Sequence, residues 1–496
     1  MANHMNQICP DYHGKLKEPL FPFRYFVMFL VFMATAIEFS SRCVLNVAIL
    51  AMVGTREEAN NNLTNYLDPQ STRINFNWDQ NDQGMALGAY YYTYAAVQII
   101  AGSMTDKFNN VRLLALSQFL ASLCTFITPL AAKTSLTCLV IVRMVLGLVH
   151  GTTFPTLYSL VDRWFSTTEL SWAQGLLETG CDFGTGLSMS FTAWISKRNL
   201  WGGWPAAFYI IGILNLMFTL VWIISVTREP QSNRFVSDFE KKQLAVIVVN
   251  KLEPTRVKKS TPWLKILTSL PLWSVVISKG INNLVYNAIN TKIPVYLESV
   301  LHFKLESNGL INASFYLAVI SSELTSGPLA KLIITKGWLS RTITRKLFES
   351  AGLTGIGLSL LAISYLGDQP NLIVICLILS MFSFGLCVGG NIPTIPEMAP
   401  NLIGTTFGFA NTLACASGFM APAIIGVILG DEPESVSKWT FSFKLMAGFQ
   451  VIALIFFNLF ATTDPQPWGD HEKDDQVKET ELIESQSIKI ISKNLD

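Results

Sequence analysis

Long apolar runs recur between Phe23 and Thr462 and are separated by shorter polar segments. Each run is about 20 residues or longer, enough for a helix to cross roughly 30 Å of hydrocarbon. The runs are continuous and do not alternate with polar residues, so they favour helices over the strands of a membrane barrel. We predict twelve spanning helices, at residues 23–53, 84–104, 112–132, 136–160, 171–195, 204–226, 271–298, 307–333, 347–367, 371–394, 402–429 and 440–461.

The composition agrees with a membrane protein and excludes other classes. Of 496 residues, 50% are hydrophobic and 14% are charged, whereas a soluble protein carries about 25% charged residues. The net charge of +1 gives no basic field for nucleic acid. The eight cysteines form no Cys-x-x-Cys pair, so we expect no disulfide framework and no metal site. We also expect no cofactor.

Lysine and arginine are distributed unevenly between the connecting segments, and this predicts the orientation in the membrane. The connection 227–270 contains nine of them, while the acidic loop 54–83 carries a glycosylation sequon at Asn62. We therefore expect both termini and the central loop in the cytosol. The expected domains are a cytosolic N-terminal segment (1–22), a six-helix half (23–226), a cytosolic basic linker (227–270), a second six-helix half (271–462) and a disordered cytosolic tail (463–496).

The two halves share a short pattern after their second span. The first half has "GSMTDKF" from Gly102 and the second has "GPLAKLI" from Gly327, with a lysine five residues and four residues after the glycine, respectively. Two six-helix halves of one topology are typical of parallel-repeat transporters. We therefore predict an all-α membrane protein with two pseudo-repeat halves.

Several motifs resemble one transporter family. The step from Gly102 to Lys107 resembles the signature loop of the major facilitator superfamily. "RCVLNVAI" (from Arg42), "RMVLGLVHGTTFP" (from Arg143) and "EMAPNLIGTTFGFANTLACASGFMAP" (from Glu397) are similar to motifs of its anion–cation symporter family. That family includes sialin, the vesicular glutamate transporters and the type-I sodium–phosphate cotransporters. The resemblance implies secondary transport of an anion.

The chain departs from the family pattern at one position of the fourth span. The proton-coupled lysosomal and vesicular members usually have a glutamate where this chain has His150. A histidine titrates between a neutral cytosol and an acidic lumen, so His150 is a candidate proton carrier. The alternative is a neutral histidine that is hydrogen bonded in the bundle.

Two arginines in the predicted spans are candidate anion-binding residues. A planar guanidinium with five donors suits a carboxylate or phosphate better than a lysine does. Glu38 lies one helical turn before Arg42 and either neutralises it or holds it until an anion arrives. Arg143 cannot deprotonate and needs an anion. Gly147 and Gly151, on its helix face, permit close helix contact.

Other polar residues in the spans complete the candidate site. Glu178 and Asp182 lie four residues apart and form a candidate proton or sodium site. The alternatives are a counter-charge for Arg143 or a gating pair. The candidate substrate residues are Arg42, Arg143, Tyr91, Tyr94, Asn391 and Asn411, the candidate ion-coupling residues are Glu38, His150, Glu178 and Asp182, and the candidate gating residues are Asp106, Lys107, Arg112 and Lys292.

The sequence therefore predicts a secondary active transporter that moves an organic or inorganic anion by alternating access. Coupling to protons, to sodium or to membrane potential stays open, as does a plasma-membrane or a lysosomal or vesicular location. The expected partners are a small anion, a coupling ion and the bilayer. The alternatives are a sodium-dependent phosphate cotransporter or a transport-dead receptor on the same fold. An enzyme is not expected, since no nucleotide loop or catalytic triad is visible.

Overall fold

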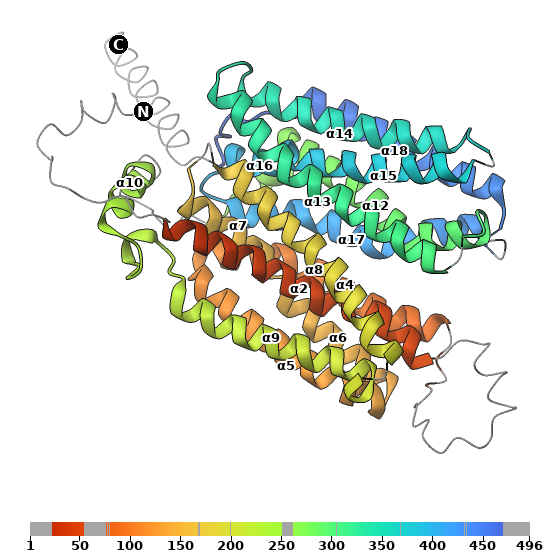
Figure 1. The fold of residues 1–496 in the computed structure, drawn as a ribbon. Helices are drawn as coiled ribbons and strands as arrows, with labels where there is room; N and C mark the ends of the chain where they lie inside the picture. The colour runs from red at the N-terminus through yellow and green to blue at the C-terminus, as the bar shows by residue number, and fades with distance from the viewer. Residues whose placement is uncertain are drawn as a thin grey trace, which may run out of the picture.

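In a computed structural model, the chain folds into a bundle of long, roughly parallel and antiparallel helices (Figure 1). The structure describes residues 22–53, 76, 78, 80–166, 169–198, 200–249, 261–303, 305–367, 369–430, 432 and 434–469. Within these residues the regular structure is helical. The predicted fold class, twelve membrane-length helices in two halves, is confirmed.

The first half contains six spans. They are α2 (Phe23–Val53), α4 (Gln80–Lys107), α5 (Asn110–Thr134), the broken pair α6 (Leu136–His150) and α7 (Thr153–Trp164), α8 (Leu170–Arg198) and α9 (Trp204–Ser225). The predicted linker contains the short helices η2 (Pro230–Ser232), α10 (Asp238–Val249) and α11 (Trp263–Leu267).

The second half repeats this order. Its spans are α12 (Leu270–Ser299), α13 (Leu305–Thr335), α14 (Arg341–Ile363), α15 (Pro370–Leu386) continued by η3 (Cys387–Gly389) and α16 (Asn391–Met398), α17 (Ile403–Leu429) and α18 (Val436–Phe460). Among the described residues, nine helices are long and apolar enough to cross a membrane by length and composition, with α6–α7 and α15–α16 each counted as one. The helices α4, α8 and α12 are as long but more polar.

The fourth span of each half is broken. The sequence predicts an interruption of the first of these spans at Phe154-Pro155, whereas we predicted the second span as continuous. The break in the first half follows Gly151, four residues before Pro155, and the break in the second half includes Gly389, four residues before Pro393. Proline has no N–H and its ring clashes with the carbonyl four residues earlier, so the helix ends there. The same Gly-x-x-x-Pro spacing therefore breaks both halves at matching points.

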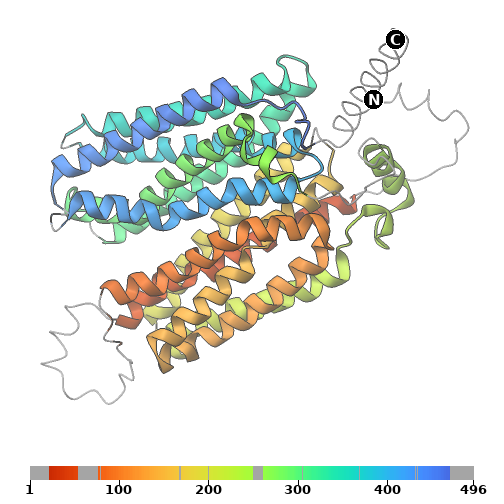
Figure 2. The same ribbon diagram turned by 180° about the vertical axis from the view of Figure 1, so that it is seen from behind.

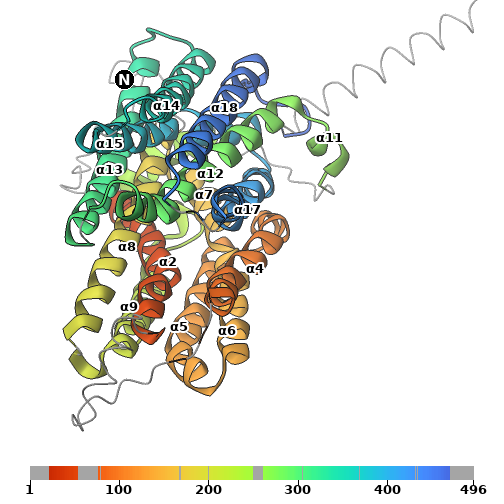
Figure 3. The same cartoon turned by 90° about the vertical axis from the view of Figure 1, so that its right-hand side faces the viewer.

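The packing within each half follows one scheme. The first span packs on the fifth and sixth, the second on the fourth and the third on the sixth, both in α2–α9 and in α12–α18. The halves then meet through α4 with α17 and α8 with α13, which is the second span of one half against the fifth of the other. Figure 2 and Figure 3 show the two groups of helices side by side. This exchange is what a pseudo-two-fold axis along the membrane normal requires.

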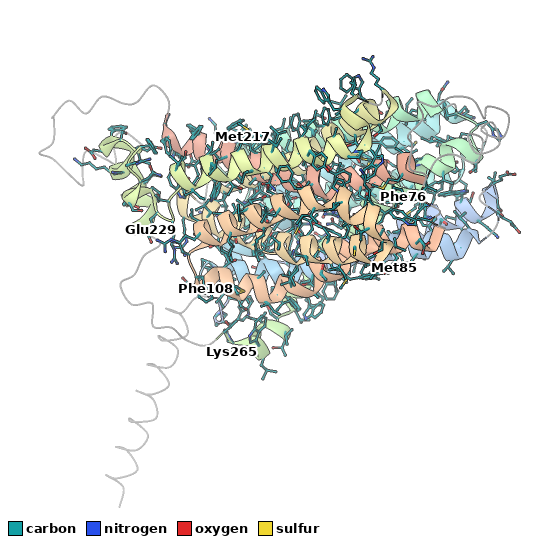
Figure 4. The ribbon with its side chains drawn as sticks, turned by 90° about the horizontal axis from the view of Figure 1, so that it is seen from below. Phe76, Met85, Phe108, Met217, Glu229 and Lys265 are labelled. Carbon is teal, nitrogen blue, oxygen red and sulfur yellow. The ribbon has the colours of Figure 1, made fainter. Side chains whose placement is uncertain are left out.

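The two halves approach most closely at one end of the bundle. A Cβ atom at Gly102 of α4 would lie 2.3 Å from the carbonyl oxygen of Gly404 of α17, so only glycine fits. At the other end of the same helices, Cβ atoms at Gly84 and Gly426 would meet nothing within 4 Å. Phe108 marks the tight end and Met85 the loose end (Figure 4). The halves are therefore closed at the end that carries the central basic loop.

A buried ion pair stabilises the tight end of the second half. Arg345 of α14 donates to Glu397 of α16 from Nη2 at 2.6 Å and from Nε at 3.1 Å, and Nη1 donates to the carbonyl of Gly389. The two side chains are only 2% and 5% exposed. In the sequence, Arg345 stands in a lysine- and arginine-rich stretch that is typical of a cytosolic connection, so sequence reasoning did not identify this pair. It fixes α14 against the broken span.

We predict that Gly102→Ala destabilises the protein by about 1–3 kcal/mol, because the added methyl group overpacks α4 against α17. Thermal unfolding of the purified protein in detergent measures the effect. Gly84→Ala is the matched control on the same helix and leaves the unfolding temperature unchanged or slightly higher. Equal unfolding temperatures for the two variants would contradict the close contact.

We predict that Arg345→Met costs about 3–5 kcal/mol of stability, because it leaves the Glu397 carboxylate buried without a partner. Replacing both residues, Arg345→Met with Glu397→Leu, recovers most of the loss. The control is Lys438→Ala, which breaks an exposed pair with Glu432 and costs about 1 kcal/mol or less. If Arg345→Met is as mild as Lys438→Ala, the ion pair does not stabilise this end.

Candidate functional site

A polar cavity lies between the two halves near the middle of the bundle. It is lined by Phe39, Arg42, Tyr94, Phe154, Glu178, Lys279, Asn282, Asn283, Tyr286, Asn287, Glu323, Phe384, Cys387, Val388, Asn391, Ile392, Asn411, Ala414 and Cys415. The lining combines two cations with carboxyl, amide and phenol groups, which is typical of a binding site for a polar solute. It contains four of the six predicted substrate residues, namely Arg42, Tyr94, Asn391 and Asn411.

Arg42 lies in the middle of α2 and faces this cavity. Its Nε donates to the hydroxyl of Tyr91 at 3.3 Å. Its guanidinium carbon lies 4.5 Å from the ring centroid of Tyr91, 4.8 Å from Phe39 and 5.5 Å from Tyr90. Within the described part of the chain, no carboxylate oxygen lies within 4.0 Å of this guanidinium. Aromatic faces stabilise a cation more weakly than a carboxylate does, so Arg42 retains the capacity to bind an anion.

Glu38 lies one turn before Arg42 but does not form an ion pair with it. The carboxyl group is fully buried, and neither oxygen is paired in a hydrogen bond, although Thr153 and Arg42 are among its neighbours. The expectation that the two side chains simply neutralise each other is therefore not what this conformation shows. A buried carboxyl group without partners is costly when ionised, which favours a bound proton.

Arg143 lies behind Arg42 and is absent from the cavity lining. It is 1% exposed, its Nη2 donates to the backbone carbonyl of Arg42 at 3.0 Å, and its guanidinium lies over the Tyr90 ring. The structure therefore places Arg143 where it supports the α2 backbone at the cation, one layer away from any solute in the cavity.

His150 and Tyr90 form the next layer of the same region. The Tyr90 hydroxyl is hydrogen bonded to Nδ1 of His150 at 3.2 Å, and Nε2 of this buried histidine has no partner among the described residues. The glycines on the Arg143 face do permit close contact, because a Cβ at Gly147 would lie 2.1 Å from the Tyr90 carbonyl oxygen. The hydrogen bond to Tyr90 agrees with the alternative interpretation, in which His150 is a neutral histidine that is hydrogen bonded in the bundle.

Several contacts close the cavity toward the tight end. The rings of Tyr158 on α7 and Phe407 on α17 stack with centroids 3.9 Å apart. Glu178 on α8 accepts a hydrogen bond from the Tyr158 hydroxyl at 2.6 Å and lies 3.8 Å from Nζ of Lys279 on α12. The Tyr158–Phe407 stack and the Glu178–Lys279 pair join the two halves, so both must break before the cavity can open at this end.

The remaining predicted residues have different positions. Lys292 is half-buried on α12 and does not line the cavity, while Arg112 is exposed at the start of α5, beside the cap residue Asn109. Asp106 and Lys107 end α4, and their side chains lie outside the described part. Asn62 also lies outside the described residues. Within the described part, no group of three histidine, cysteine or acidic residues could bind a metal ion.

Sequence reasoning missed the polar face of α12. Asn283 and Asn287 lie four residues apart beside Tyr286 and line the cavity, and the Asn287 amide donates to Ser417 of α17 at 3.0 Å. The pattern "INNLVYNAIN" carries this spacing and could have revealed the face. Glu349 on α14 was also missed. It is fully buried and binds Ser278 and both the backbone and side-chain nitrogens of Asn391.

Comparisons with known proteins match the whole bundle. The sequence model described as the Major Facilitator Superfamily covers residues 25–422. Human sialin is 29% identical over 460 residues, which are 90% of this chain and 91% of sialin. A Drosophila melanogaster protein described as a candidate inorganic phosphate cotransporter is 29% identical over 470 residues, 92% of this chain and 88% of that protein.

A solved structure shows the same fold. The proton:xylose symporter XylE superposes with a TM-score of 0.67 at 12% identity, covering 89% of this chain and 97% of XylE. The predicted family is therefore confirmed by sequence, and the repeated packing scheme and the broken fourth spans agree with it. The chain belongs to the major facilitator superfamily.

Proposed function

We propose that this protein is a secondary active transporter that moves an organic or inorganic anion across a membrane by alternating access. The observation that supports this best is Arg42, a guanidinium in the central cavity with no carboxylate within 4.0 Å in the described part of the chain. A cation at bilayer depth costs at least about 2.5–3.5 kcal/mol. A mobile anion that enters the cavity would offset this cost.

Lys279 supplies a second cation on the opposite wall. It is tied to Glu178 at 3.8 Å and lies 4.9 Å from the Phe407 ring centroid, at the floor of the cavity. A substrate anion that approaches Lys279 competes with Glu178 for it. Substrate binding would thus weaken a contact between the halves, and this links occupancy of the cavity to opening at the tight end.

An organic anion fits the cavity better than inorganic phosphate does. Asn391 lines the cavity, and its Oδ1 atom is buried with no donor among the described residues. A free acceptor of this kind favours a solute that carries several hydroxyl, amide or ammonium donors, whereas the phosphate dianion has a single P–OH donor and otherwise only acceptors. Phosphate is the second candidate, because the Drosophila relative bears that name.

The other predicted roles remain part of this proposal. Glu38 and the pair Glu178 and Asp182 are the acids assigned to ion coupling, with His150 as a further candidate. Asp106, Lys107, Arg112 and Lys292 are assigned to gating. The two halves would be residues 23–226 and 271–462. The membrane would be the plasma membrane or a lysosomal or vesicular membrane, with the linker and both termini on its cytosolic side.

We predict that Arg42→Ala lowers uptake of a labelled organic anion into proteoliposomes by about 30-fold or more, because a charge-assisted, bidentate contact is lost. Arg42→Lys retains the charge but not the planar fork, so its uptake should fall between the two. Arg198→Ala removes an exposed arginine that lies over Trp194 and is the control. Normal uptake by Arg42→Ala would exclude Arg42 as the anion-binding residue.

We predict that sialate or glutamate competes for uptake about tenfold more strongly than phosphate, since one or two extra hydrogen bonds are worth about 1 kcal/mol each. A competition panel of sialate, glutamate, urate and phosphate measures this. Stronger competition by phosphate, together with loss of uptake when choline replaces sodium, would support the phosphate cotransporter instead.

A further inference from the structure

Three carboxyl groups gather where α8 of the first half meets α12 and α13 of the second. They are Glu178 and Asp182 on α8 and Glu323 on α13. Asp182 is 6% exposed and Glu323 is 2% exposed. Both Glu178 and Glu323 line the central cavity, so the cluster borders the proposed substrate path.

The three groups differ in how their charge is compensated. Glu178 has the ammonium of Lys279 at 3.8 Å and a hydrogen bond from Tyr158. Among the described residues, the Tyr286 hydroxyl donates to Asp182, and the Asp182 carboxyl group lies within hydrogen-bonding reach of the Glu323 carboxyl. Oε2 of Glu323 is buried and takes no hydrogen bond from a described hydroxyl, amide or amine. In the described ranges of the chain, neither Asp182 nor Glu323 has a lysine or arginine nitrogen within 4.0 Å.

Two carboxylates cannot donate to each other, so a hydrogen bond between them requires one proton. Without that proton, two negative charges would face each other in a dry interior, and this repulsion is what makes such pairs share a single proton. We propose that Asp182 and Glu323 hold one exchangeable proton between the two halves and that this pair is the proton-coupling site. The inference rests on the proposed transport function.

The placement of the pair couples protonation to the conformational change. Asp182 belongs to the first half and Glu323 to the second, and α8 and α13 form one of the two most extensive helix contacts between the halves. Rocking of the halves alters the distance between the two carboxyl groups, so the proton is bound more tightly in one conformation than in the other. A ligand shifts a conformational equilibrium only through such a difference.

The described side chains around the Asp182–Glu323 pair supply no cation that is free to neutralise it, so a proton is the simplest way to compensate its charge. The other charged or titratable side chains near it are Glu178 and Cys181 on α8, Lys279 and Tyr286 on α12, Tyr158 on α7, Tyr316 on α13 and Cys43 on α2. Lys279 is the one cation among these side chains, and it is paired with Glu178. Sodium is the other cation that carboxylates and hydroxyls bind, so the test includes a sodium arm.

Infrared difference spectroscopy tests the shared proton without transport. The purified full-length protein at neutral pH should show the carbonyl band of a protonated carboxylic acid. Asp182→Asn and Glu323→Gln should each remove or shift one such band, and Asp182→Glu should retain it. Glu432→Gln, at an exposed position, is the control and leaves the spectrum unchanged. A band that is identical in both neutral variants and the parent protein would overturn the proposal.

Proteoliposome transport tests the coupling. Exchange of internal for external anion needs no net proton movement, so the exchange rate of each variant, Asp182→Asn and Glu323→Gln, is measured first and its accumulation is compared with that rate. Accumulation driven by a pH gradient of one unit, up to about tenfold with one proton per anion, should be lost in both. Accumulation by both variants equal to that of the parent protein would overturn the proposal. So would accumulation that follows sodium and ignores the pH gradient.

Failure of the proposed function has a different signature. If the parent protein exchanges no anion, the transport proposal fails, and the infrared measurement still decides whether Asp182 and Glu323 share a proton. If the parent protein exchanges anions but never responds to a pH gradient, transport stands and this inference fails.

Discussion

A guanidinium group in the middle of a membrane-embedded bundle needs a compensating partner, and the rest of the site is arranged around that need. Arg42 is surrounded by aromatic faces and one phenol, while the carboxyl group four residues away remains unpaired. Arg143 donates to the Arg42 backbone from behind and so supports the helix at this point. The cation is therefore stabilised enough to fold, but it is still able to bind an anion from the cavity.

The second constraint is that the halves are joined by polar contacts as well as by packing. Tyr158 stacks on Phe407, Glu178 approaches Lys279, and Asp182 accepts from Tyr286, in each case across the interface between the halves. The Glu178–Lys279 and Asp182–Tyr286 contacts respond to charge, whereas the ring stack and the apolar packing do not. A solute anion at Lys279 or a proton at Asp182 thus changes the free energy of the closed end directly. This arrangement is what coupled alternating access needs.

The fold followed from the sequence because hydrocarbon thickness alone fixes the length of a spanning helix. The break in the fourth span of the second half was missed, although Gly389 with Pro393 carries the same signal as Gly151 with Pro155. The site was predicted less completely. Arg42 could be identified as cavity-facing, but the depth of Arg143 depends on how α6 packs against α4, which no local pattern specifies. The Arg345–Glu397 pair and the approach of Glu323 to Asp182 join residues far apart in the chain, so they required the tertiary structure.

The account depends on Arg42 being the place where the transported anion binds. An experimental structure of the full-length protein, determined with and without the transported anion, tests this most directly. We expect the anion in the cavity with two of its oxygens accepting from the Arg42 guanidinium, and Tyr91 displaced or shared as a donor. An anion bound elsewhere, or Arg42 paired with Glu38 in both structures, would contradict the account.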